Sequence, residues 1–171
     1  MSEATDAADT DTPLLFGRVL DGQGGGRAID WDEVHGWQPS VSGEVLWVHL
    51  CRNREGVQDW LEAQLGIPEP TAELLTSDQT RPRAFREGGT LVGTLRGINF
   101  NPGAEPEDMI SMQFWCDGHR LVTLRRHPLQ TPREVLSLLD RGHGPPDAGA
   151  VRHPPAQPGR SRAVLPCLLP P

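Results

Sequence analysis

The sequence contains no lysine and no tyrosine, and its acidic residues outnumber its basic ones. The sixteen basic residues are all arginine and face 23 acidic residues, which leaves a net charge of -7. Proteins that bind nucleic acid generally need a basic surface to contact phosphates, so this balance argues against a nucleic-acid partner. Aromatic residues make up only 5% and do not alternate with arginines, which argues against a single-strand binding platform.

Long apolar runs are also missing. No stretch of roughly 18 apolar residues occurs, so the sequence predicts no membrane-spanning helix. The first twelve residues carry four acids and no basic residue, unlike a secretory signal. The cysteines at 51, 116 and 167 form no CxxC pair, which predicts neither a disulfide scaffold nor a structural zinc site. We expect a cytoplasmic location.

Recognisable catalytic motifs are absent as well. There is no GxSxG, and no cysteine stands in a known catalytic context. The glycine-rich segment 22–26 lacks the GK[ST] of a phosphate loop and the Rossmann spacing, so a hairpin turn is the better interpretation. We therefore expect no enzyme, with no catalytic and no cofactor-binding residues.

Composition divides the chain into three parts. Residues 1–12 are predicted to be a disordered acidic lead, and residues 13–142 a folded domain. Residues 143–171 hold eight of the 17 prolines, which block regular hydrogen bonding, so we expect an irregular tail there. That tail has two explanations, a natural flexible segment or a shifted reading frame in GC-rich DNA.

Apolar periodicity predicts the elements of the folded part. Helices are expected at 54–65 with Asn53 as cap, at 71–76, and from a capping box of Thr131 and Glu134 to Gly142. Asp117-Gly118 predicts a type I′ turn, and one or two helical turns fit 30–39. Strands are expected at 15–20, 27–29, 45–50, 83–87, 91–99, 109–116 and 119–126. The mixture predicts an α/β fold, a mixed β-sheet with helices packed on its faces.

Five segments, in order, resemble the N-terminal cytoplasmic domain of CorA-superfamily divalent-cation transporters, close to the zinc-transporting branch. The likeness covers about residues 14–149, essentially the whole folded part. Its segments are Leu20-Asp21-Gly22, Trp47-Val48-His49-Leu50, the Thr80-Arg81-Pro82-Arg83 stretch with Ser77-Asp78-Gln79 before it, 89–99 ending in Leu95-Arg96-Gly97-Ile98-Asn99, and the hairpin 117–125.

The resemblance implies a homopentameric transporter of a divalent metal, zinc or magnesium, at the cytoplasmic face of the bacterial inner membrane. In that family a long stalk helix, two membrane helices and a Gly-Met-Asn signature follow the cytoplasmic domain. This sequence departs from the pattern after Gly149. We therefore expect a regulatory and assembly domain that contacts the membrane only through that missing part and does not transport alone. The alternative is a free-standing soluble interaction or metal-sensing module derived from the domain.

Several constellations could hold an ion, although the sequence leaves the metal-binding residues unknown. His49 and Cys51 share one face of a strand and could bind zinc, but a buried core pair is the favoured interpretation. His35, His119 and His127 lie in other elements. A further set is the acidic loop Glu105, Glu107 and Asp108, for which solvation is favoured over cation attraction. The last set is Arg81, Arg83, Arg86 and Arg96. An anion site is conceivable there, but the family resemblance suggests that they pair with carboxylates within the domain or across subunits, which is the favoured interpretation.

Overall fold

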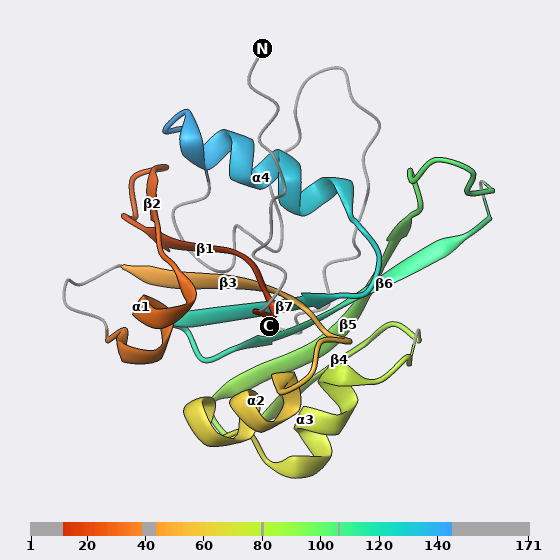
Figure 1. Ribbon diagram of the computed structural model, residues 1–171, viewed down its shortest axis with the longest axis horizontal. Helices are drawn as coiled ribbons and strands as arrows, with labels where there is room; N and C mark the ends of the chain where they lie inside the picture. The colour runs from red at the N-terminus through yellow and green to blue at the C-terminus, as the bar shows by residue number, and fades with distance from the viewer. Residues whose placement is uncertain (1–11, 39–43, 80, 106, 145–171) are drawn as a thin grey trace.

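One mixed sheet forms the centre of the described protein (Figure 1). The computed structural model describes residues 12–38, 44–79, 81–105 and 107–144. Within them the strand order is β2-β1-β3-β7-β6-β5-β4, and only the β3–β7 pair is parallel. The predicted mixed sheet is therefore confirmed. The strands are β1 Leu14–Leu20, β2 Gly26–Ala28, β3 Val45–Cys51, β4 Arg83–Glu87, β5 Thr90–Ile98, β6 Met109–Cys116 and β7 Arg120–Arg125.

Helices cover both faces of this sheet. The helices are α1 Trp31–Gly36, α2 Val57–Leu65, α3 Glu69–Thr76 and α4 Gln130–Asp140. Figure 1 shows α4 on one face and the α2–α3 hairpin on the other. Among the described residues, no helix is long and apolar enough to span a membrane.

The strand β3 is buried on both faces because every one of its residues except His49 is apolar. Leu46, Val48 and Leu50 join the larger core cluster beneath α1, α2 and α3. Val45 and Trp47 point the other way, into the cluster that α4 closes. Full burial of one such side chain is worth about 1.5–3 kcal/mol, so the alternating contacts of β3 fix its register between the two helical layers.

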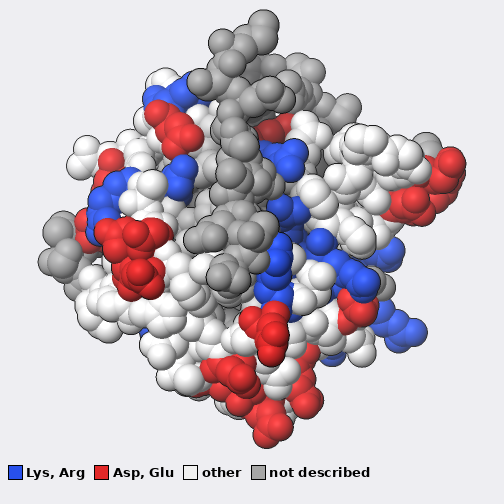
Figure 2. Space-filling model, in the orientation of Figure 1, with Lys and Arg blue, Asp and Glu red and all other residues white. Residues whose placement is uncertain are grey.

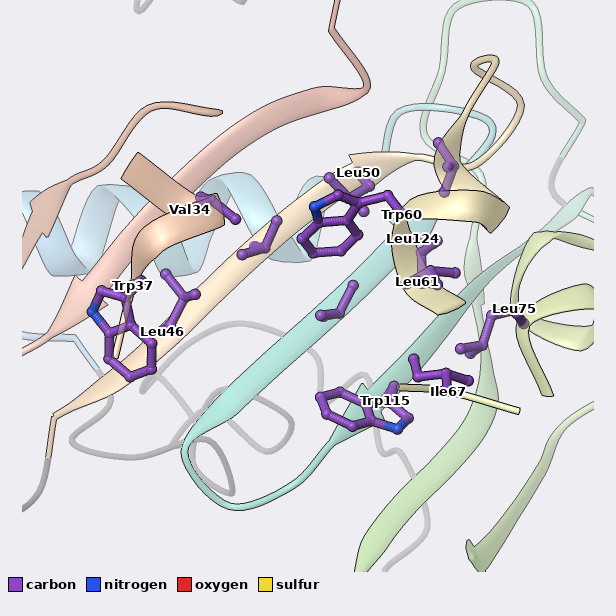
Figure 3. Packing of buried hydrophobic residues seen from close by; sticks show 14 of the residues in the cluster. Val34, Trp37, Leu46, Leu50, Trp60, Leu61, Ile67, Leu75, Trp115 and Leu124 are labelled. Carbon is purple, nitrogen blue, oxygen red and sulfur yellow. The ribbon is translucent and has the colours of Figure 1, made fainter. Parts of the chain in front are cut away.

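Tryptophans fill much of the larger cluster (Figure 3). Trp37, Trp60 and Trp115 come from α1's C-terminal end, α2 and β6, and all three are less than a tenth exposed. The Trp60 ring also lies 5.0 Å from the Trp31 ring, centroid to centroid. These contacts hold the short helix α1 against the sheet, although six residues alone would not form a stable helix.

The helix starts differ from the predicted ones. Helix α2 begins at Val57, three residues later than expected, because Gly56 takes a left-handed conformation with φ 82°. Asn53 does not cap it; its side-chain oxygen lies 3.0 Å from Cys51 Sγ instead. Helix α3 begins at Glu69, earlier than expected, since a proline is tolerated in a first turn.

The predicted capping box of α4 is wrong. The N-cap is Leu129, which has no side-chain cap bond, and Glu134 accepts a hydrogen bond from Gln130 Nε2. A capping box does form at α1, between Asp30 and Glu33. The predicted type I′ turn is also wrong, because that turn needs two consecutive positive φ values and only Gly118 has one. Gly142, with φ 72°, ends α4 as predicted.

Candidate functional site

His49 lies in the middle of the sheet, on the face that α4 covers in part. It is 2% exposed, and its ring stacks on Phe16 with centroids 4.8 Å apart. Its Nδ1 lies 2.7 Å from Thr123 Oγ1, which also accepts a 3.0 Å hydrogen bond from Trp47 Nε1. The Thr123 hydroxyl also lies 3.5 Å from the Val48 carbonyl, so His49 Nδ1 is the nearer of its two possible acceptors.

The surroundings of His49 keep the ring neutral. Burial, and then the nearby Arg125 charge, lower its pKa from 6.5 to about 3. In the tautomer in which Nδ1 accepts from Thr123, the single ring proton lies on Nε2. A neutral imidazole can bind a metal ion, but this one is already committed to the hydrogen bonds of the core.

Cys51 follows on the same face of β3, as predicted, but the pair gains no further ligand. Its thiol is half-buried and bonds Asn53, not His49. Among the described residues, no three His, Cys, Asp or Glu side chains form a group that could hold a metal. His35 in α1, His119 in the β6–β7 turn and His127 after β7 do not complete one. The geometry matches the core interpretation of His49 and Cys51.

A second polar centre lies on the opposite face, where Arg52 leaves β3. Arg52 is 6% exposed; its Nη2 lies 2.9 Å from Asp78 Oδ1, and its Nη1 donates to Gln113 Oε1 at 2.9 Å. Arg126 Nη1 contacts the same Asp78 oxygen at 3.0 Å. The hydrogen bonds from Arg52 and Arg126 hold the pKa of the exposed Asp78 carboxyl below its usual range.

Gln113 completes this centre from inside the sheet. It is fully buried in β6, and its Nε2 lies 3.3 Å from the Ser77 carbonyl and 3.2 Å from the Gln79 carbonyl. The segment after α3 is thus tied to β6 and, through Asp78, to Arg52. Sequence reasoning missed this network. Its signal was a glutamine inside the apolar strand Met109–Cys116, since a buried amide requires partners.

The four arginines of the predicted cluster are exposed and lie on β4, β5 and the residues just before β4. In the register, Arg83 lies opposite Thr94 and Arg96 opposite Ser111, so both point to the face that α3 covers in part, while Arg86 points to the other. None of the four forms an ion pair with a described residue. The expected pairing with carboxylates inside the domain is therefore absent among the described residues. The other half of that expectation, pairing with carboxylates of another subunit, stays a prediction.

Acidic side chains gather elsewhere on the same side of the molecule. Residues 55–76, which include α2 and α3, hold five acids and no basic residue. Figure 2 shows them as a red surface at the lower edge, with arginines to the right. The predicted acidic loop lies between β5 and β6; its Glu105, Glu107 and Asp108 are exposed, as expected of a solvated loop, and belong to no metal-binding group among the described residues.

Comparison with known proteins decides the family. A family model described as "CorA-like Mg2+ transporter protein" matches residues 42–153. The "Divalent cation transporter CmaX" of Pseudomonas aeruginosa is 39% identical over 139 residues, which are 81% of this chain and 42% of that protein. The chain belongs to the CorA-like family.

A second curated relative in the CorA-like family is the "Zinc transport protein ZntB" of Klebsiella pneumoniae, 31% identical over 80% of this chain and 40% of its own length. The chain thus spans about two fifths of the length of these two relatives.

Solved structures in the CorA-like family share the fold. The "structure of the full-length CmaX protein" superposes with a TM-score of 0.78 at 37% identity, over 85% of this chain and 45% of that one. The ZntB cytoplasmic domain from Vibrio parahaemolyticus gives a TM-score of 0.68 at 25% identity, over 78% of this chain and 52% of that one. The predicted resemblance, and with it the fold of a CorA-type cytoplasmic domain, is confirmed.

Proposed function

We propose that this chain is the cytoplasmic domain of a CorA-like transporter of divalent metal ions, zinc or magnesium, with a regulatory and assembly role. The observation that carries the proposal is the match to CmaX and to the ZntB cytoplasmic domain over about four fifths of the chain. The relatives are named as transporters and not as enzymes, which supports a non-catalytic role. We assign ion permeation, as part of this proposal, to the length of the transporter that this chain does not match.

The mechanism would be indirect. The described domain is a sheet packed between two layers of helices. Because its core is close-packed, the domain moves as a rigid unit more easily than it deforms. Binding of a metal ion between copies in a homopentamer would favour one relative position of the domains. A stalk would carry that bias to a pore, which makes metal binding and opening two coupled events. The domain would act at the cytoplasmic face of the inner membrane.

A chimera tests this proposal. The segment of full-length CmaX that superposes on this chain would be replaced by residues 13–144, and the purified chimera reconstituted in liposomes. We expect Zn²⁺ or Mg²⁺ influx, followed with a trapped fluorescent indicator, that responds to metal on the domain side. CmaX itself and CmaX lacking the segment are the controls.

One outcome would overturn the proposal. A chimera that inserts and assembles as CmaX does, yet passes neither ion under conditions where CmaX passes one, has no transporter function in this domain. The alternative of a free-standing module would then be favoured, because Arg83 and Arg96, which are exposed and form no ion pair with a described residue, offer a contact surface whether or not a pore is attached.

A further inference from the structure

Three exposed arginines gather where β4 begins beside β5. Arg83 is the first residue of β4, and Arg81 comes just before it. Arg96 follows Thr94 by two residues on β5, and Thr94 lies opposite Arg83, so Arg83 and Arg96 point to the same face. All three arginines are exposed, and none forms an ion pair with a described residue. We call Arg81, Arg83 and Arg96 the arginine patch.

Protection of the sheet edge does not account for the whole patch. Arginine on an edge strand discourages pairing with another chain, and β4 is an edge strand. Arg96, however, lies on β5, which has strands on both sides. The neighbouring Arg52 and Arg126 share the carboxylate of Asp78. Arginines therefore pair with a carboxylate in this region where a described residue supplies one, and the patch has room for another.

The N-terminal end of β1 lies in the same row of the sheet as the patch. The Pro13 carbonyl accepts a 2.9 Å hydrogen bond from the backbone nitrogen of Cys51, the last residue of β3. From Cys51 the register runs across β7, β6 and β5 through Arg125, Met112 and Leu95. Leu95 directly precedes the β5 arginine of the patch. The residues before Pro13 therefore join the sheet at the end where the patch lies.

These residues carry the charge that the patch lacks, and they are long enough to reach it. Residues 1–11 hold Glu3, Asp6, Asp9 and Asp11 and no basic residue. Strands lie about 4.8 Å apart, so β5, four strands from β1, is about 19 Å away, and β4 about 24 Å. An extended chain covers about 3.3 Å per residue, which gives Asp6 a reach of about 23 Å from Pro13 and Glu3 about 33 Å.

We propose that the acidic segment 3–11 docks on the arginine patch of its own chain, with Asp6 placed for β5 and Glu3 for β4. Each exposed ion pair is worth only about 0–1 kcal/mol, but the covalent link keeps the effective concentration of the segment high. Such a contact adds little to the free energy of unfolding. It would cover Arg83 and Arg96 against other acidic partners. The inference goes beyond the transporter proposal, because it concerns the domain alone.

A paramagnetic label on the segment tests the docking. A nitroxide attached at Ala4→Cys broadens the amide signals of nearby residues in the ¹⁵N spectrum of the full 171-residue chain. Cys51→Ser and Cys167→Ser remove two competing thiols, and Cys116 is buried. Circular dichroism would check that this background keeps the fold.

We expect broadening at the amides of the arginine patch when the salt concentration is low. The amide of Arg27 should stay sharp, since this exposed arginine lies on the other edge strand, β2. Salt at about 1 M should abolish the broadening at the patch, because the Debye length there shrinks to about 3 Å.

Charge reversal gives the decisive comparison. Glu3→Arg/Asp6→Arg and Arg83→Glu/Arg96→Glu should each lose the broadening at the patch, because each places like charges together. The variant that combines all four changes should regain it, since the opposite charges are then exchanged between segment and patch. A misfolded variant would not regain it. Arg27→Glu is the matched control and should keep the wild-type broadening.

A wild type without broadening at the patch at low salt would refute the docking, and so would broadening that all the reversals leave unchanged. A mixture of a labelled ¹⁴N chain and an unlabelled ¹⁵N chain completes the test. Broadening in that mixture would mean that the segment contacts a second copy, contrary to the proposal. The transport test uses residues 13–144, which lack the segment, so the failure of either proposal leaves the other standing.

Discussion

At the scale of single residues, His49 illustrates how burial changes what a side chain can do. A histidine beside a cysteine on one strand face suggests a zinc pair, yet His49 is held by Thr123 and stacked on Phe16. Burial and the Arg125 charge both disfavour its protonated form. The residue is therefore better described as a neutral hydrogen-bond acceptor of the core, and its titration is linked to folding.

This linkage predicts how stability depends on pH. Because the pKa of His49 is lower in the folded state, about 3 against 6.5, the unfolded chain binds the proton more tightly. Its contribution to stability is full above pH 6.5 and falls as the pH drops towards 3, by up to about 1.4 kcal/mol per pH unit. Urea unfolding should show a smaller loss in His49→Gln than in the wild type over that window.

The control for this comparison is His127→Gln, because His127 is exposed. We expect it to retain the wild-type pH dependence. Equal slopes for the wild type and His49→Gln would show that His49 gains its proton without a cost to folding, which contradicts the buried, neutral assignment.

At the scale of elements, a polar network positions the connection between α3 and β4. Gln113 reaches from β6 to the carbonyls of Ser77 and Gln79, and Asp78 is held between Arg52 and Arg126. Those contacts link the C-terminal ends of the parallel strands β3 and β7, and the middle of β6, to a segment without regular structure.

Gln113→Leu should therefore destabilise the domain although it keeps the side-chain volume. The change removes the Oε1 atom that accepts a hydrogen bond from the buried Arg52 Nη1. Loss of that acceptor should lower the free energy of unfolding by about 1–3 kcal/mol. Urea unfolding measures the loss, and amide exchange should rise at residues 77–79. The matched control is Gln58→Leu, a half-buried glutamine on α2 that we expect to change stability by less than about 0.5 kcal/mol. A Gln113→Leu protein as stable as the wild type would mean that Arg52 finds another acceptor.

At the scale of the whole molecule, one sheet and four helices make up the part that the structure describes. Its two core clusters lie on opposite faces of the same strands, so neither helical layer can separate without exposing the sheet. The predicted lead 1–12 and tail 143–171 fall almost wholly outside the described residues and stay predictions. The family model itself extends to residue 153.

Removal of the two ends tests that division. A chain of residues 13–144 should unfold in urea in a single transition, with the midpoint and slope of the full chain, because both core clusters lie within it. A lower midpoint would mean that the ends contribute to the folded core. A smaller slope would mean that they bury additional surface when the full chain folds.

The strands were predicted closely, whereas the helix starts were not. An apolar run such as β3 leaves little freedom, since a shift by one residue would exchange its two buried faces. Caps depend on backbone conformation instead. Asn53 and Thr131 are suitable caps by residue type, but the N-caps of α2 and α4 are Gly56 and Leu129. The reason is that the packing of buried residues, Trp60 in α2 and Val135 in α4, decides where each helix meets the sheet.

By itself, the sequence determined the class of fold, the order of the elements and the family, because these follow from apolar periodicity and from short segments in a fixed order. Only the tertiary structure decided which polar residues meet. The pairing of His49 with Thr123, and of Arg52 with Gln113 and Asp78, joins residues that are distant in sequence and brought together by the sheet. Strand order is a long-range choice made by the packing of the whole core, and local patterns do not encode it.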